Sequence, residues 1–94
     1  MKTNQIAEKI VNQLGGRGPL AAMIGASDFD AMVDGVWFAF KGSRVANNIE
    51  IKVTNDLYNI EFFKGTKSVG KVTQIDASQM KSAIEQKTKL YLSL

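Results

Sequence analysis

Apolar and polar residues alternate through much of the segment 36–75. Apolar side chains occupy the first, third and fifth positions of 49–53, and polar or charged ones lie between them. The segment 58–62 repeats the pattern. Successive side chains of a strand point to opposite faces, so this period of two predicts an antiparallel sheet with one buried face.

Turn-forming residues divide this block into strands. The four predicted strands are 36–41, 47–54, 57–64 and 69–75. Asn55 and Asp56, which both tolerate positive φ, form a two-residue turn between the second and third strands. In the fourth strand Val69 and Val72 differ in parity, and Gly70 between them could host a bulge that resets the register.

An amphipathic helix is predicted before the sheet. Apolar residues of 6–14 recur at helical spacing along one stripe. Thr3 or Asn4 can serve as the N-cap, and Gly15 can end the helix in a left-handed conformation.

The segment between this helix and the first predicted strand is less regular. A glycine-rich breaker covers 15–18, and Pro19 can open a short helical turn over 20–24. An acidic loop through Asp28 and Asp30 is expected to follow.

A second helix is predicted after the sheet. Asp76 is a suitable N-cap, and Gln79 can complete a capping box. Residues 90–94 alternate again, which suggests a short extended tail. The side chains expected to face the sheet are Met80, Ala83 and Ile84, together with the aliphatic stem of Lys87.

The order helix, short turn, four strands, helix predicts a two-layer α+β fold. We expect a four-stranded antiparallel meander covered on one face by the N- and C-terminal helices. At 94 residues, the chain 1–94 is expected to form a single domain.

The composition argues against catalysis. The chain has no histidine and no cysteine, so the commonest general bases, nucleophiles and metal ligands are missing. No enzyme activity, cofactor or metal is therefore expected. The apolar stretch 19–26 is too short to span a bilayer, and we predict a soluble, cytoplasmic protein without a membrane partner.

Two motif-like segments have simpler explanations. The Gly-Gly-Arg-Gly sequence at 15–18 could cradle a phosphate with Arg17 as a clamp, but it lacks the preceding strand of a dinucleotide fingerprint and is better explained as a helix stop. Asp28 could begin a calcium loop. Met32 and Val33, however, stand where that loop needs an oxygen ligand and a glycine.

Aromatic residues among charges mark the sheet face that the helices leave uncovered. By parity, Trp37 and Phe63 lie opposite the buried Phe38 and Phe62. Exposed aromatics of this kind serve protein-binding hot spots or base-stacking platforms. The alternatives are that the segment 18–34 buries Trp37, or that parity breaks at Phe63.

Basic residues form the second candidate site. Residues 1–40 carry three basic and four acidic side chains, whereas residues 41–94 carry nine and five, giving the chain a net charge of +3. Arg44, Lys64, Lys67 and Lys71 lie around the inter-strand connections and could follow a phosphate backbone. They could equally be solvating residues that block edge pairing.

Short segments spread through the chain also resemble a known family. They are 14–16, 23–26, 38–40, 48–51, 56–58, 61–62 and 90–94. In these the chain is similar to a family of small, functionally uncharacterised proteins of bacteriophages, prophages and other mobile elements. Lys89 departs from the family, which typically has glycine there. The resemblance implies a phage-related, intracellular origin and supplies no catalytic or binding residues.

We therefore expect a phage- or prophage-encoded accessory protein that binds another protein, either a host factor or a second copy, through the uncovered sheet face around Trp37 and Phe63. The alternative is a nucleic-acid-binding module that uses the basic loops.

Overall fold

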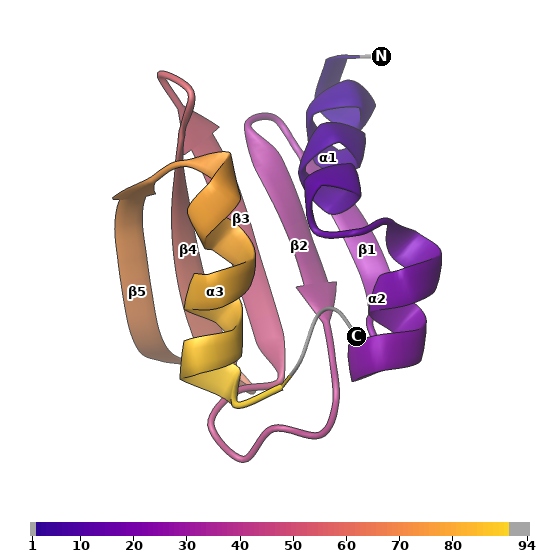
Figure 1. Cartoon of the computed structure of the whole chain (residues 1–94), viewed down its shortest axis with the longest axis vertical. Helices are drawn as coiled ribbons and strands as arrows, with labels where there is room; N and C mark the ends of the chain where they lie inside the picture. The colour runs from indigo at the N-terminus through magenta and orange to yellow at the C-terminus, as the bar shows by residue number, and fades with distance from the viewer. Residues whose placement is uncertain (1, 91–94) are drawn as a thin grey trace.

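The sheet of the computed structural model is a five-stranded antiparallel meander, and its strands are neighbours in the order in which they follow one another along the chain. The structure describes residues 2–90, with side chains from residue 5 onward. The elements are α1 (Lys2–Gln13), α2 (Arg17–Ile24), β1 (Ser27–Met32), β2 (Gly35–Ala39), β3 (Asn48–Thr54), β4 (Leu57–Lys64), β5 (Lys67–Ile75) and α3 (Ala77–Thr88). All three helices lie on one face of the sheet, which gives the predicted two layers (Figure 1).

The number of strands differs from the sequence-based prediction. The segment expected to be an acidic loop through Asp28 and Asp30 is β1, which pairs with β2 and makes the sheet five-stranded rather than four-stranded. β1 lies at the edge, most of its residues are exposed, and its register shifts between Ser27 and Asp30. An edge strand of this kind is held by backbone hydrogen bonds and carries no clear alternation of apolar residues.

The predicted turn at 20–24 belongs to a longer helix. α2 begins at Arg17, and Pro19 is its third residue rather than its first. The proline is tolerated there because the first N–H groups of a helix have no intrahelical acceptor. Gly25, with φ +66, ends the helix.

Turn geometry follows the sequence closely. Asn55 and Asp56 both have positive φ, 54° and 64°, as the predicted two-residue turn between β3 and β4 requires. α1 includes Thr3 and Asn4, so the prediction that one of them is the N-cap was wrong. Gly15 has the expected positive φ at the end of this helix.

The predicted bulge at Gly70 is confirmed. Gly70 pairs with Phe62, whereas Phe63 pairs with Ser68, so Val69 is an extra residue in β5. This extra residue lets both Val69 and Val72 pack against the core despite their different parities.

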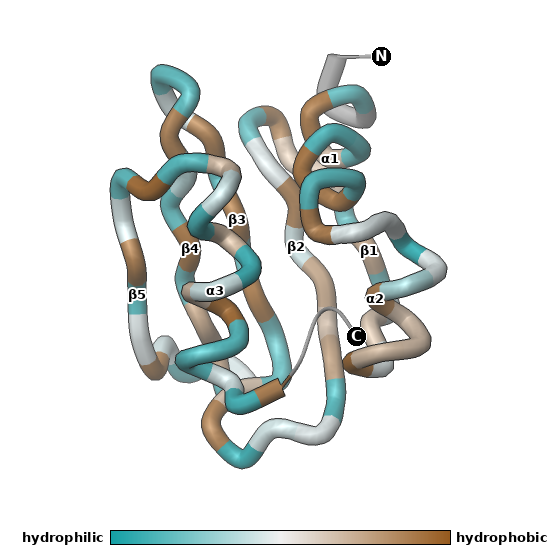
Figure 2. The backbone as a smooth tube through the Cα atoms, viewed as in Figure 1, coloured by the Kyte–Doolittle hydropathy of each residue, from teal (hydrophilic) through white to brown (hydrophobic). Residues whose placement is uncertain are grey.

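One buried core joins the helices to the sheet. β3 and β4 place alternate residues in it, and Figure 2 shows the corresponding change of hydropathy along both strands. Tyr58 is buried at the start of β4 and donates a hydrogen bond from its hydroxyl to Gln13 Oε1 over 2.7 Å, which ties α1 to the sheet. The largest fully buried side chains are Phe38, Phe62, Ile10, Leu14, Leu20, Ile49, Ile51, Ile60, Met80, Ile84, Val11 and Val36.

The ends of α3 show why it starts and stops where it does. Gln79 Oε1 accepts a hydrogen bond from the Asp76 N–H over 3.1 Å, as expected of the predicted capping box. Lys89 ends the helix in the left-handed conformation with φ +64, which glycine adopts most easily. Apart from Leu90, the predicted tail 90–94 lies outside the described residues.

Between residues 2 and 90, no helix is long and apolar enough to cross a membrane.

Candidate functional site

The face of the sheet away from the helices, here called the open face, carries a row of side chains that crosses all five strands. Trp37 is at its centre and pairs with Asp30 of β1 on one side and Glu50 of β3 on the other. Glu50 pairs with Glu61 of β4, which in turn pairs with Lys71 of β5. Directly opposed residues of antiparallel strands have Cβ atoms about 5 Å apart. The carboxylates of Asp30 and Glu50 therefore flank the indole on both sides.

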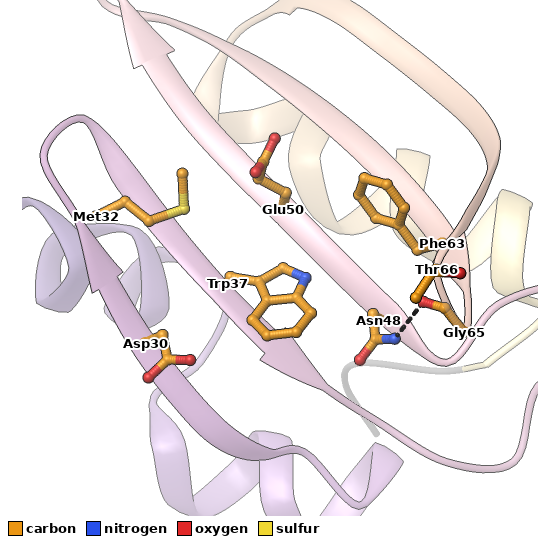
Figure 3. A pocket seen from close by; sticks show the side chains of 8 residues that line it. All are labelled: Asp30, Met32, Trp37, Asn48, Glu50, Phe63, Gly65 and Thr66. Carbon is orange, nitrogen blue, oxygen red and sulfur yellow. Dashed lines mark hydrogen bonds between the residues drawn. The ribbon is translucent and has the colours of Figure 1, made fainter.

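An open pocket of about 760 Å³ surrounds Trp37. Figure 3 shows the indole at its centre, with Asp30 and Glu50 on opposite sides of the ring and Phe63 beyond Glu50. We call this the aromatic pocket. The residues that line it are Asp30, Met32, Trp37, Asn48, Glu50, Phe63, Gly65 and Thr66.

The structure thus brings Trp37 and Phe63, the two aromatic residues selected from the sequence, into one pocket. Trp37 is half-buried between the side chains of neighbouring strands, while Val36 and Phe38 beside it point into the core. α2 lies on the other side of the sheet (Figure 1), and β1, the other element of the segment 18–34, lies beside Trp37 and leaves the indole partly exposed, so this segment does not bury Trp37 completely.

Phe63 retains its place on the open face although the β4–β5 register shifts beside it. It pairs with Asn48 and Ser68 and is half-buried. The extra residue of the bulge lies in β5, so β4 itself keeps its regular alternation. The alternative in which parity fails at Phe63 is therefore wrong.

A hydrogen-bond network holds the rim of the pocket next to Phe63. Asn48 Nδ2 donates to the Gly65 carbonyl oxygen over 3.1 Å, the dashed line in Figure 3. The Gly65 N–H donates to Asn47 Oδ1 over 2.9 Å, and the Asn47 N–H donates to the Phe63 carbonyl oxygen over 2.8 Å. These bonds fix the β4–β5 turn against the start of β3, so this side of the pocket is preformed.

The pocket carboxylates have few partners. Among the described residues Asp30 makes no side-chain hydrogen bond and no ion pair. Glu50 Oε1 lies 3.9 Å from Lys52 Nζ, and both side chains are partly exposed. An exposed pair at that distance stabilises the fold by only about 0–1 kcal/mol. The pocket therefore combines apolar walls with negative charge that the described side chains neutralise only weakly.

Sequence reasoning missed several of the lining residues. Asn48 and Glu50 share a face with Trp37, and the alternation along β3 carried the signal that could have found them. Asp30 and Met32 could not be found in this way, because their segment was predicted to be a loop.

Three of the four predicted basic residues gather at one end of the sheet. Arg44 lies in the exposed loop between β2 and β3, and Lys64 pairs with Lys67 in the β4–β5 hairpin. Asn47 joins the loop to the hairpin through the bonds described above. Lys71 does not join them, because it lies within β5 and opposite Glu61 on the open face.

The C-terminal end of α3 adds cations to the same end of the molecule. The Lys87 side chain lies against Gly70 of β5, and Leu90 lies next to Gly42 of the β2–β3 loop. Figure 1 shows this helix ending beside that loop. The basic end therefore comprises Lys41, Arg44, Lys64, Lys67, Lys87 and Lys89.

Arg17 has intramolecular partners instead of forming a phosphate clamp. Its Nη2 lies 2.6 Å from Glu8 Oε1, and its guanidinium carbon lies 5.0 Å from the centroid of the Phe29 ring. The glycines on both sides of it separate α1 from α2, as a helix stop does. In the part of the chain from 2 to 90, no cluster of three carboxylates is suited to hold a metal ion.

The chain matches no protein-family model, no curated protein and no solved structure.

Proposed function

We propose that this chain is a non-enzymatic accessory protein, encoded by a phage or prophage, that binds another protein in the cytoplasm of a bacterial host through the open face. The partner is a host factor or a second copy of the chain. The observation that carries the proposal is the aromatic pocket: Trp37 and Phe63 line one depression on the face that the helices leave uncovered.

Apolar side chains of the open face that remain in water raise the free energy of the unbound protein. Tryptophan and phenylalanine bury large apolar areas, and interface hot spots are enriched in tryptophan within well-packed pockets. Trp37 is partly exposed in the middle of a row of charged residues, although the same strand has buried positions on its other face. A partner that covers Trp37 and Phe63 would remove this apolar surface from water.

Two further observations support binding rather than catalysis and a phage origin. The chain lacks histidine and cysteine. Its short segments from 14–16 to 90–94 resemble the phage and prophage family.

The test is a comparison of Trp37→Ala with Leu57→Ala. Leu57 is 37% exposed in the strand that also carries Phe63, but lies at the opposite end of the sheet from the pocket rim. Both variants should keep the circular-dichroism spectrum of the wild type. Trp37→Ala alone should lose the dominant protein captured from infected host cells, or lose self-association in sedimentation. Equal behaviour of the two variants would count against the open face as the binding surface.

A second candidate function rests on the basic end. Arg44, Lys64 and Lys67 gather there with the cations of α3, whereas the connections at the opposite end of the sheet carry Asp34, Asp56 and Asp76. A one-sided cationic surface of this kind suits the phosphate backbone of a nucleic acid.

This candidate predicts binding to single- or double-stranded DNA that weakens steeply with salt. Lys64→Ala/Lys67→Ala should weaken it by roughly tenfold or more, while Lys9→Ala/Lys81→Ala removes the same charge elsewhere and should change it far less. The absence of any mobility shift with either DNA at low salt would remove this candidate.

A further inference from the structure

The apolar walls and the charge of the aromatic pocket indicate which kind of partner side chain it can bind. Its walls are the faces of Trp37 and Phe63 with the thioether of Met32, and its charged lining residues are Asp30 and Glu50. Every charged group in the lining is therefore negative. Apolar aromatic walls alone suit a neutral side chain, whereas aromatic walls flanked by carboxylates suit a cation.

The geometry favours a planar cation over the Trp37 ring. The carboxylates belong to the strands on either side of Trp37 and are its direct cross-strand neighbours. A flat group stacked on the indole can donate hydrogen bonds at its edges to one or both of them. Guanidinium has this shape, with five N–H donors in one plane, and it stacks on aromatic faces and pairs bidentately with carboxylates. An ammonium group offers only a compact, strongly hydrated charge.

The protein already contains one arginine that contacts both an aromatic ring and a carboxylate. The Arg17 guanidinium carbon lies 5.0 Å from the Phe29 ring centroid while its Nη2 contacts Glu8 Oε1 at 2.6 Å. At that place the arginine, the aromatic ring and the carboxylate all belong to this chain and interact with one another. The aromatic pocket has the ring and two carboxylates, and the described residues place no arginine in it.

We infer that the aromatic pocket receives an arginine side chain of the partner protein, with the guanidinium stacked on Trp37 between the carboxylates of Asp30 and Glu50. This rests on the proposed function, because it names the chemistry by which the open face recognises its partner. The occupant is an arginine of a separate protein, and the carboxylates of Asp30 and Glu50 carry the charge complementary to its guanidinium.

Trp37 is the only tryptophan of the chain, so its fluorescence reports on the pocket directly. The probe is the peptide acetyl-Gly-Arg-Gly-amide, and its control replaces arginine with citrulline, a neutral group of nearly the same shape. For so small a ligand, the arginine peptide should bind with Kd on the order of 1 mM. The citrulline peptide should bind at least roughly tenfold more weakly, because it lacks the charge that the carboxylates recognise.

Charge-neutralising variants locate the site. Asp30→Asn and Glu50→Gln should each weaken binding of the arginine peptide by roughly three- to tenfold. Asp56→Asn removes the same charge in the β3–β4 turn, away from the pocket, and should leave binding unchanged. Asparagine also tolerates the positive φ at position 56, so this control variant should fold normally.

Three results would overturn the inference. One is equal affinity for arginine and citrulline peptides, and another is an equal effect of Asp56→Asn and Asp30→Asn. The third is no fluorescence change up to tens of millimolar peptide with a folded protein. If Trp37→Ala still abolished partner capture in that case, the proposed function would stand and only the arginine assignment would fail.

Self-association provides a separate check on the source of the arginine. Both arginines of this chain are exposed, but Arg17 is already paired with Glu8, which leaves Arg44 as the candidate arginine of a second copy. Self-association lost to the same extent in Arg44→Ala and Asp30→Asn would overturn the assignment to a separate protein, since the occupant would then be a second copy.

Discussion

Gly35 lies directly against the backbone of Ile51 on the neighbouring strand. A Cβ atom at position 35 would overlap the Ile51 carbonyl oxygen and would lie 2.8 Å from its carbonyl carbon and 2.9 Å from Lys52 Cα. These are backbone atoms of a central strand, which cannot swing aside as a long side chain can. The close approach of β2 and β3 at this point therefore requires glycine.

Gly35→Ala is accordingly expected to destabilise the protein. Separating two paired strands disrupts the sheet next to the row that carries Trp37, and we expect a loss of about 2–4 kcal/mol in the free energy of unfolding. Chemical denaturation monitored by circular dichroism measures this loss.

Gly18→Ala is the matched control for that experiment. A Cβ at Gly18 would have no atom within 4 Å, and the residue lies in α2. Alanine should be neutral there or stabilising by up to about 1 kcal/mol, because it favours helix over the unfolded chain. Similar losses in the two variants would contradict the steric explanation.

Adjacent residues of β2 should respond differently to truncation. Phe38 is 1% exposed and contacts the Phe29 ring at a centroid distance of 5.1 Å, whereas Trp37 is partly exposed on the other face. We expect Phe38→Ala to cost about 3–5 kcal/mol and Trp37→Ala about 1 kcal/mol in the free energy of unfolding. Denaturation curves of both variants measure the difference. A loss at Trp37 as large as that at Phe38 would assign the indole to the core.

The Tyr58–Gln13 hydrogen bond should contribute measurably to the attachment of α1. Tyr58→Phe removes the hydroxyl and leaves the ring in the core, and we expect a cost of about 1 kcal/mol. A double-mutant cycle with Gln13→Ala should give a coupling energy of about 0.5–1.5 kcal/mol between the two side chains. Additive effects would show that the bond contributes nothing to stability.

Lys89 ends α3 in a conformation that an L-residue adopts only at a cost. With φ +64, this position favours glycine. Lys89→Gly should therefore be more stable than Lys89→Ala by about 1 kcal/mol, since both variants remove the charge and only glycine relieves the strain. Thermal unfolding of the two variants checks this order. Equal melting temperatures would show that the left-handed conformation is not populated.

Elements with a strong local pattern were predictable from the sequence. The apolar stripe of α1, the alternation of β3 and β4, the turn at Asn55 and the bulge beside Gly70 all depend on residues close together in the chain. β1 had no such pattern, because an edge strand with mostly exposed residues is specified by the backbone hydrogen bonds of β2 rather than by its own side chains.

The candidate site, too, was predictable from the sequence only in part. Alternation placed Trp37 and Phe63 on the uncovered face, and the structure confirms that face. Their position in one pocket depends on the register of β2, β3 and β4, which no local pattern determines. Asp30 joins them only because β1 pairs with β2.

The sequence by itself determined the alternating block from 36 to 75, its buried face and the absence of histidine and cysteine. Short-range periodicity and composition are local properties, and a chain displays them before it folds. Only the tertiary structure decided that two carboxylates flank Trp37 and that Arg44 and Lys64 share one end of the sheet. Those neighbours come from separate strands and loops, and strand pairing together with the hydrogen bonds of Asn47 brings them together.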